Sequence, residues 1–187
     1  TATLLENNNN GNATRANIAI DDNGNAMAVW RQISIANSGA TRTIWARYYT
    51  ASTTSWGTAV EIENLTTGFA DSSAAPRVAF DSNGNALVVW SYFDGVGRYD
   101  IRANRYTAST PGWSAAAEYL ETETTYDARH PQIAIDSSGN AMAVWEQSDV
   151  TYSSIWSNRY TPVGGWGAAA LVGTATDRGN ARSPQVA

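Results

Sequence analysis

The chain has 187 residues, 43% of them hydrophobic and 16% charged, with a formal net charge of −5. This is enough apolar material for one domain of ordinary size. All twelve cationic residues are Arg, and they are scattered without forming a basic stripe, so a nucleic-acid partner is not expected. The absence of Cys excludes disulfides, thiolate catalysis and Cys-based metal sites, and no apolar run approaches the roughly 18 residues that span a bilayer.

A thirteen-residue phrase occurs three times along the chain: IAIDDNGNAMAVW at 18–30, VAFDSNGNALVVW at 78–90 and IAIDSSGNAMAVW at 133–145. Each copy holds two β-rich runs separated by a short turn segment, the pattern of a tight β-hairpin. Asp suits the first turn position, where its side chain can bond to the backbone ahead, and Gly suits the position that needs φ > 0. We therefore predict that the structural turn residues are Asp21, Gly24, Asp81, Gly84, Asp136 and Gly139.

Two further phrases follow each hairpin. The first reads IWARYYT, IRANRYT and IWSNRYT at 44–50, 101–107 and 155–161, and its alternation predicts a half-exposed third strand. The second starts at Trp56, Trp113 and Trp166 and predicts a more polar outer strand. Four strands in about 57 residues are typical of a β-propeller blade. We predict an all-β fold, one β-propeller domain over 1–187, with three four-stranded blades at 16–75, 76–130 and 131–183.

The two ends repeat parts of the same unit. ATLLEN at 2–7 matches AVEIEN at 59–64, and SPQVA at 183–187 matches HPQIA at 130–134. Residues 1–15 are therefore expected to end a preceding blade, and 184–187 to start a following one. Because closed propellers have about four to eight blades, we expect either a piece of a longer repeat protein or an assembly of several copies. The end in mid-phrase favours the piece.

The lengths of the links predict where a ligand binds. The first hairpin and the link between the third and fourth strands are nearly constant in length, whereas the link between the second and third strands varies. In an up-and-down blade the variable links share one face with the blade-to-blade connections, and variable loops on a rigid scaffold usually carry binding. The polar and aromatic residues predicted there to bind a glycan or protein are Arg42, Tyr92, Asp94, Arg98, Tyr99, Asp149 and Tyr152.

Two tryptophans on the predicted third strands are further candidates. Trp45 and Trp156 could stack on a sugar ring, although packing between strands would use them equally well. Arg102 stands at the same site in the second unit, which argues against a ring of identical sugar sites.

The phrases PQIAIDSSGNAMAVWEQ, SIWSNRYTPVGGWGAAALV and RSPQVA resemble a family of bacterial tandem-repeat proteins. The resemblance covers nearly the whole chain. It departs from the pattern at 15–17, where Arg-Ala-Asn replaces the proline-containing segment of later units, and at Arg102. The resemblance implies β-propeller-like blades and an extracellular or cell-surface location, and it implies no particular reaction.

Catalytic chemistry finds little support in the sequence. His130 is the only His and precedes a proline in a blade connection, which suggests a structural or solvent-facing role. Glu146 and Asp149 can be nominated as a carboxylate pair for glycoside hydrolysis, but nothing singles them out. Calcium needs six to eight oxygen ligands, and only Asp21 with Asp22 offers adjacent carboxylates, so turn formation is favoured over metal binding. We predict no catalytic residues, no metal and no cofactor.

Three classes of function remain as hypotheses. The leading one is a non-enzymatic extracellular binding or adhesion module, whose variable-loop face meets a glycan or protein. The second is a structural subunit of a coat or filament that self-associates by exchanging strands or blades, since unpaired sheet edges readily add a strand. The third, held least, is a glycosidase-like enzyme.

Overall fold

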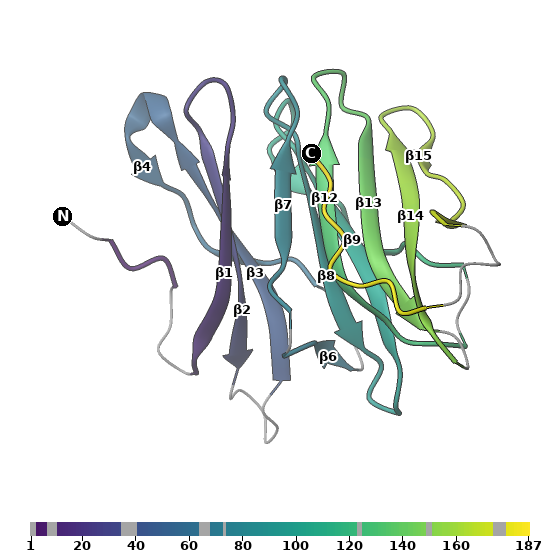
Figure 1. The fold of residues 1–187 in the computed structure, drawn as a ribbon. Coiled ribbons are helices and arrows are strands. Elements are labelled where there is room, and N and C mark those ends of the chain that lie inside the picture. Colours follow the sequence, from purple (N-terminus) through teal and green to yellow (C-terminus); the bar gives the residue numbers. More distant parts are fainter. Residues whose placement is uncertain are drawn as a thin grey trace.

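The computed structural model describes residues 3–6, 11–34, 41–63, 68–72, 74–122, 125–148, 151–173 and 179–187. These residues form three antiparallel sheets that follow one another along the chain, and one short 3-10 turn, η1, at Ala51–Thr53 (Figure 1). Among them, no helix has the length and apolar character that a bilayer crossing would need.

The first sheet contains β1 (Ala13–Ile20), β2 (Ala26–Ser34), β3 (Thr41–Thr50), β4 (Ser55–Trp56) and β5 (Val60–Glu61). The strands pair in the order β1-β2-β3-β4, and β5 also pairs with β3. The outer strand is therefore one strand in two short pieces. The amide of Gly57 still donates to the carbonyl of Tyr48 between the two pieces, which continues the ladder.

The second sheet has the same plan with an interrupted inner strand. It contains β6 (Phe69–Ala70), β7 (Arg77–Phe80), β8 (Ala86–Phe93), β9 (Tyr99–Thr107), β10 (Gly112–Trp113) and β11 (Glu118–Tyr119). Both β6 and β7 pair with β8, and both β10 and β11 pair with β9.

The third sheet contains β12 (Ala128–Ile135), β13 (Ala141–Ser148), β14 (Ser153–Thr161), β15 (Gly165–Trp166) and β16 (Ala170–Leu171), and it repeats the order of the first. In both of these sheets the inner strand has a register shift, at Thr14/Asn17 and at Arg129/Gln132. Arg15 and His130 have φ of 60° and 55° at the shift, and Ser183 adopts φ of 54° at the matching place of the next unit. The inner-strand bend therefore repeats along the chain.

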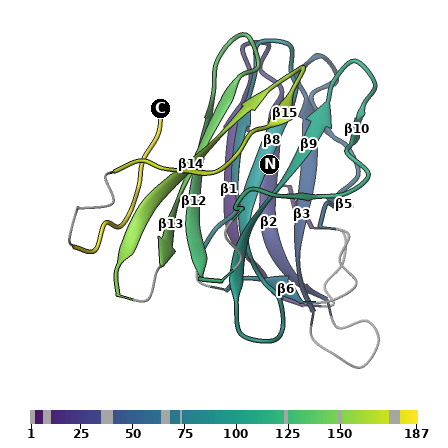
Figure 2. The same ribbon diagram turned by 90° about the vertical axis from the view of Figure 1, so that its right-hand side faces the viewer.

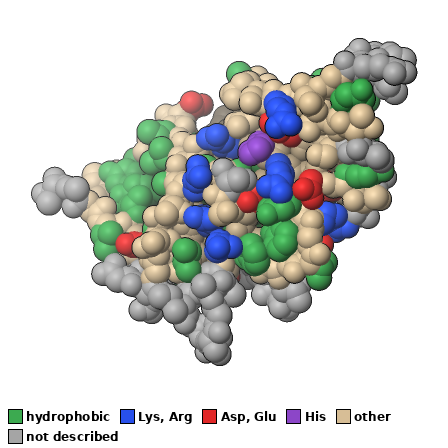
Figure 3. All heavy atoms as spheres, turned by 60° about the horizontal axis from the view of Figure 1, so that its bottom comes forward, with side chains coloured by type: hydrophobic (Ala, Val, Ile, Leu, Met, Phe, Trp, Pro, Cys, Tyr) green, Lys and Arg blue, Asp and Glu red, His purple; other side chains and the backbone are tan. Residues whose placement is uncertain are grey.

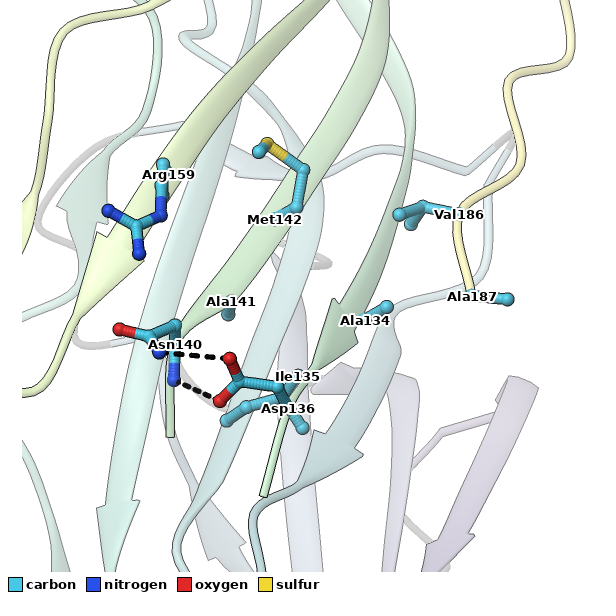
Figure 4. Close-up of a pocket in the computed structure, with 9 residues that line it drawn as sticks. All are labelled: Ala134, Ile135, Asp136, Asn140, Ala141, Met142, Arg159, Val186 and Ala187. Atoms are coloured by element: carbon cyan, nitrogen blue, oxygen red, sulfur yellow. Dashed lines mark hydrogen bonds between the residues drawn. The ribbon is translucent and has the colours of Figure 1, made fainter. Parts of the chain in front are cut away.

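Each hairpin corner is built by its Asp. In the first, Asp21 Oδ1 accepts the amides of Asn23 and Asn25, each at 2.9 Å. Gly24 follows at φ 79°, a conformation that glycine adopts without the strain of a Cβ atom. The other two corners repeat this arrangement, and Figure 4 shows the third, where Asp136 accepts two bonds from Asn140.

The three sheets pack face to face through conserved positions of the repeat unit's geometry. The indoles of Trp30, Trp90 and Trp145 are 3%, 1% and 0% exposed, and each lies on the face toward the preceding sheet. The opposite faces of the first two sheets bury Ile62 and Leu120, each 1% exposed. Burial of these faces on one another supplies the hydrophobic stabilisation of the fold.

A side-chain bond repeats at each of these packed faces. Asn104 Nδ2 donates to the carbonyl of Ile62 at 2.9 Å, and Asn158 Nδ2 donates to that of Leu120 at 2.8 Å. Arg47 occupies the same position in the first sheet, and its Nη1 donates to the carbonyl of Leu5 at 2.9 Å. The segment at 3–6 therefore lies where an outer strand of a preceding blade is expected, although it is not itself assigned as strand.

The ends of the blades differ in character. Figures 1 and 2 show that the hairpins after β1, β7 and β12 lie at one end of the molecule, and that β6 and the turn between β8 and β9 lie at the other. We call these the hairpin end and the loop end. The tight links thus share one end and the variable links share the other.

Candidate functional site

The loop end gathers most of the positive charge of the chain (Figure 3). Strand register places seven of the twelve arginines there: Arg15, Arg31, Arg42, Arg77, Arg98, Arg129 and Arg182. The inner strands all begin at this end, so arginines far apart in the sequence converge. The scattered arginines of the sequence therefore do form a patch once the chain is folded, although the chain as a whole is acidic.

Three of these guanidinium groups are near enough to influence one another. Burial lowers the pKa of Arg31 from its ordinary value, and the like charges of Arg42 and Arg15 lower it further. Arg31 donates to Thr14 Oγ1 through Nε and Nη2, at 3.2 and 2.7 Å. A positive potential of this kind favours an anionic or strongly hydrogen-bonding ligand.

A row of stacked side chains crosses the loop end from the first sheet to the third. The Arg42 guanidinium lies 4.9 Å from the Phe69 ring centroid, Phe69 lies 4.9 Å from Phe93, and Phe93 lies 4.8 Å from Tyr99. Arg129 closes the row, with its guanidinium carbon 3.3 Å from the Tyr99 centroid. All five side chains are half-buried. We call this row the arginine–aromatic ladder.

The structure separates the predicted binding residues into different roles. Arg42 and Tyr99 belong to the ladder, and Tyr152, 38% exposed, lies beside the link that precedes β14. Asp149 lies outside the described residues. Phe69 and Arg129 were missed by sequence reasoning, because both lie in blade-to-blade connections rather than in the variable links.

Asp94 and Arg98 shape the loop between β8 and β9. Asp94 Oδ1 accepts the amides of Val96, Gly97 and Arg98 at 2.9, 3.0 and 3.0 Å. Burial opposes the charged form of Asp94, but these amide bonds prevail and lower its pKa. Arg98 Nε lies 2.8 Å from Asp100 Oδ1, and the hydrogen bond to Asp100 raises the pKa of Arg98. Both residues therefore already bond within the loop.

Three predictions about exposed aromatic residues need correction. Tyr92 lies in β8 rather than in the link and is only 2% exposed, so its side chain belongs to the core and does not face solvent. Trp45 packs with Trp30 and Leu5, and Trp156 packs on the core between the second and third sheets. Their strand alternation suggested exposure, but adjoining segments cover these faces. Arg102 lies over the Tyr92 ring at 5.3 Å, in the place that Trp has in the other units.

A pocket opens beside the ladder, where the inner strand of the third sheet meets residues 182–185. Its volume is about 370 Å³, and its lining includes Arg77, His130, Gln132, Glu146, Arg182 and Gln185. Glu146 uses both oxygens: Oε1 accepts the amide of Ser183 at 2.7 Å, and Oε2 lies 3.2 Å from His130 Nδ1. His130 is thus held against a carboxylate.

The hairpin end carries the opposite charge. A smaller pocket of about 210 Å³ there is lined by residues that include Asp21, Asp22, Asp81 and Asp136. Three of these carboxylates hold their own hairpins. Within the described ranges, no group of three or more His, Cys, Asp or Glu side chains is arranged to hold a metal ion.

Comparison with known proteins identifies the fold. Neither a protein-family profile nor a curated protein sequence matches this chain. The structure is similar to that of a Hadza microbial sialidase, with a TM-score of 0.57 and 10% sequence identity, over 84% of this chain and 37% of the sialidase. An endo-arabinase from Bacteroides thetaiotaomicron matches with a TM-score of 0.48 and 14% identity, over 93% of this chain and 60% of the arabinase.

The chain therefore spans less than two thirds of the length of either protein. At such identities the likeness to the sialidase establishes the fold alone. The predicted fold class is confirmed: the chain is all-β and folds as β-propeller blades, each with four strands of which the outer one is in two pieces.

Proposed function

We propose that this chain is a non-enzymatic binding module that recognises a glycan at its loop end, in an extracellular or cell-surface setting. The arginine–aromatic ladder is the observation that supports this. Half-buried aromatic rings offer flat apolar faces for sugar rings, and guanidinium groups donate hydrogen bonds to sugar oxygens. The fold is compatible with this function, because one protein of similar fold is named a sialidase.

A binding role is favoured over hydrolysis by the state of the nominated carboxylates. Glu146 is engaged by His130 and by the amide of Ser183, and Asp100 is engaged by Arg98. Glycoside hydrolysis uses two carboxyl groups that flank the bond to be broken. Neither Glu146 nor Asp100 is free to take such a place without losing a partner.

Replacing Tyr99 by Ala should weaken oligosaccharide binding about tenfold or more, because it removes the ring on which Arg129 stacks. The measurement is a screen of immobilised oligosaccharides followed by titration calorimetry of the strongest ligand. Tyr119→Ala is the matched control. Tyr119 is 53% exposed on β11 and also has a guanidinium, that of Arg102, 4.8 Å from its centroid, but it lies away from the loop end. Equal losses in both variants would contradict the proposal.

A second candidate function, self-assembly through the outer face of the third sheet, is favoured by one observation. Val172 holds the position of Ile62 and Leu120, since its amide donates to Ile155 as theirs donate to Ile44 and Ile101. Those two residues are 1% exposed, whereas Val172 is 59% exposed. Figure 4 shows Met142 and Val186 facing a pocket of about 370 Å³ on this face.

Static light scattering tests this second candidate. If the face mediates assembly, the 187-residue chain should form a defined multimer, and Val172→Asp should convert it to a monomer, because a carboxylate cannot be buried there without a partner. Val163→Asp is the control, since Val163 is fully exposed in the turn before β15. A wild-type chain that is monomeric at all concentrations would rule this candidate out.

A further inference from the structure

We propose that the pocket beside the ladder is a carboxylate-recognition site, and that the glycan bound at the loop end is therefore acidic, built from uronic-acid residues. This inference rests on the proposed function and adds the chemical class of the ligand. It concerns Arg77, Arg182, Gln132 and Gln185, none of which the variable links contain.

The pocket lies where successive inner strands approach one another. Asn17, Arg77, Gln132 and Gln185 each precede the first apolar residue of their unit, so they hold one register position on four neighbouring segments. In the first of these, Asn17 Oδ1 accepts the amide of Val78 from the next blade, which shows that this position faces the following inner strand. Arg77 at the same position thus faces the third sheet, where the pocket opens.

Arg77 has unused hydrogen-bonding capacity. Its Nε is buried without a hydrogen-bond partner among the described residues, and neither Arg77 nor Arg182 has a carboxylate within ion-pair distance there. By contrast, Arg98 and Arg129 of the same end are paired with acidic side chains. A buried donor without an acceptor is costly, and an incoming carboxylate would satisfy it.

The chemistry of the lining matches an acidic sugar. Guanidinium groups bind carboxylates through two parallel hydrogen bonds, which are stronger than bonds between neutral groups. The amides of Gln132 and Gln185 offer both donors and acceptors for sugar hydroxyls. The volume of about 370 Å³ lies within the range of small-ligand pockets, roughly 300–1,000 Å³. The acidic hairpin end would repel the same ligand, which orients it to the loop end.

The test compares a homologous ligand pair that differs only in charge. Oligogalacturonate and its fully methyl-esterified form are titrated into the 187-residue chain by calorimetry. The acid should bind at least about tenfold more tightly than the ester, and added salt should weaken the acid alone. Arg77→Gln should remove the preference for the acid, whereas Arg77→Lys, which keeps the charge but loses the fork, should retain part of it.

Arg159→Gln is the matched control, because Arg159 is an exposed arginine near the hairpin end and lines a different pocket. Unchanged melting temperatures would show that each variant folds. Equal binding of acid and ester, or a preference for the acid that survives in Arg77→Gln, would overturn the inference. Binding of neutral oligosaccharides without the acid would overturn the inference and leave the proposed glycan function standing. Binding of no carbohydrate would overturn both.

Discussion

The free energy of unfolding of this protein should fall as the pH rises from about 5 to about 8.5. Two buried carboxyl groups cause this. Burial raises the pKa of Glu63 to about 8, and hydrogen bonds from Trp90 and Ile44 and the charge of Arg102 only partly offset it. Burial likewise raises the pKa of Glu121 to about 8, and the neighbouring Asp100 contributes in the same direction.

The sign follows from proton binding. Between the ordinary pKa of 4.5 and the folded value near 8, each group holds a proton in the folded chain but not in the unfolded chain. The unfolded state therefore binds fewer protons, and stability declines as the pH rises. The stabilisation is fully present below about pH 4.5 and is lost as the pH passes through about 8.

Thermal unfolding at several pH values measures this effect. We expect the melting temperature to drop by at least about 5 °C between pH 5 and pH 8.5. The double variant Glu63→Gln/Glu121→Gln should lose most of this slope. It should also be less stable at pH 5, because an amide at position 63 can accept only one of the two donors, Trp90 Nε1 and the Ile44 amide, that Glu63 now accepts.

The exposed Glu118 on β11 supplies the control for this experiment. Glu118→Gln should leave the pH dependence unchanged. The groups whose pKa is lowered, Asp94 and Asp136, act in a separate window, since their contribution is lost only when the pH falls through their own low pKa values. A melting temperature that rises between pH 5 and pH 8.5 would show that Glu63 and Glu121 are ionised in the folded chain.

Trp145→Ala should destabilise the chain by about 3–5 kcal/mol, as expected for removing a large buried aromatic side chain. The indole is 0% exposed, packs between the second and third sheets, and donates from Nε1 to Gln147 Oε1 at 2.9 Å. The loss therefore combines a cavity with an unsatisfied acceptor. Urea unfolding followed by tryptophan fluorescence and circular dichroism measures the change in the free energy of unfolding.

Trp156→Ala gives the matched comparison, because Trp156 lies directly opposite Trp145 in the register of β13 and β14 but is only half-buried. Its cost should be less than half that of Trp145→Ala. Equal costs would mean that Trp156 carries as much of the packing as Trp145. The comparison also separates a packing role from the sugar-stacking role first considered for Trp156.

The glycan hypothesis and the assembly hypothesis make independent demands on the molecule. The first depends on the loop end, and the second depends on the outer face of the third sheet, which carries Met142 and Val172. Tyr99→Ala and Val172→Asp therefore change one function without the other. Both functions could coexist on a repeat scaffold, because its loops and its packing faces lie on different sides of each blade.

The repeated phrases determined the fold class of this protein from sequence alone. The corner chemistry of Asp21 and Gly24, and the alternation that sets strand against turn, act over a few residues and need no knowledge of distant segments. The same locality explains why the loop end could be distinguished from the hairpin end by link length.

Which face of each strand is covered, and which distant residues meet, was decided only by the tertiary structure. Tyr92 reads as an exposed aromatic beside a loop, yet the neighbouring segments bury it. Glu63 is an ordinary acidic residue in the sequence, but the next blade brings the indole of Trp90 to it and removes water. Arg77 and Arg182 are 105 positions apart and share a pocket, because inner strands from successive blades begin at the same end of the molecule.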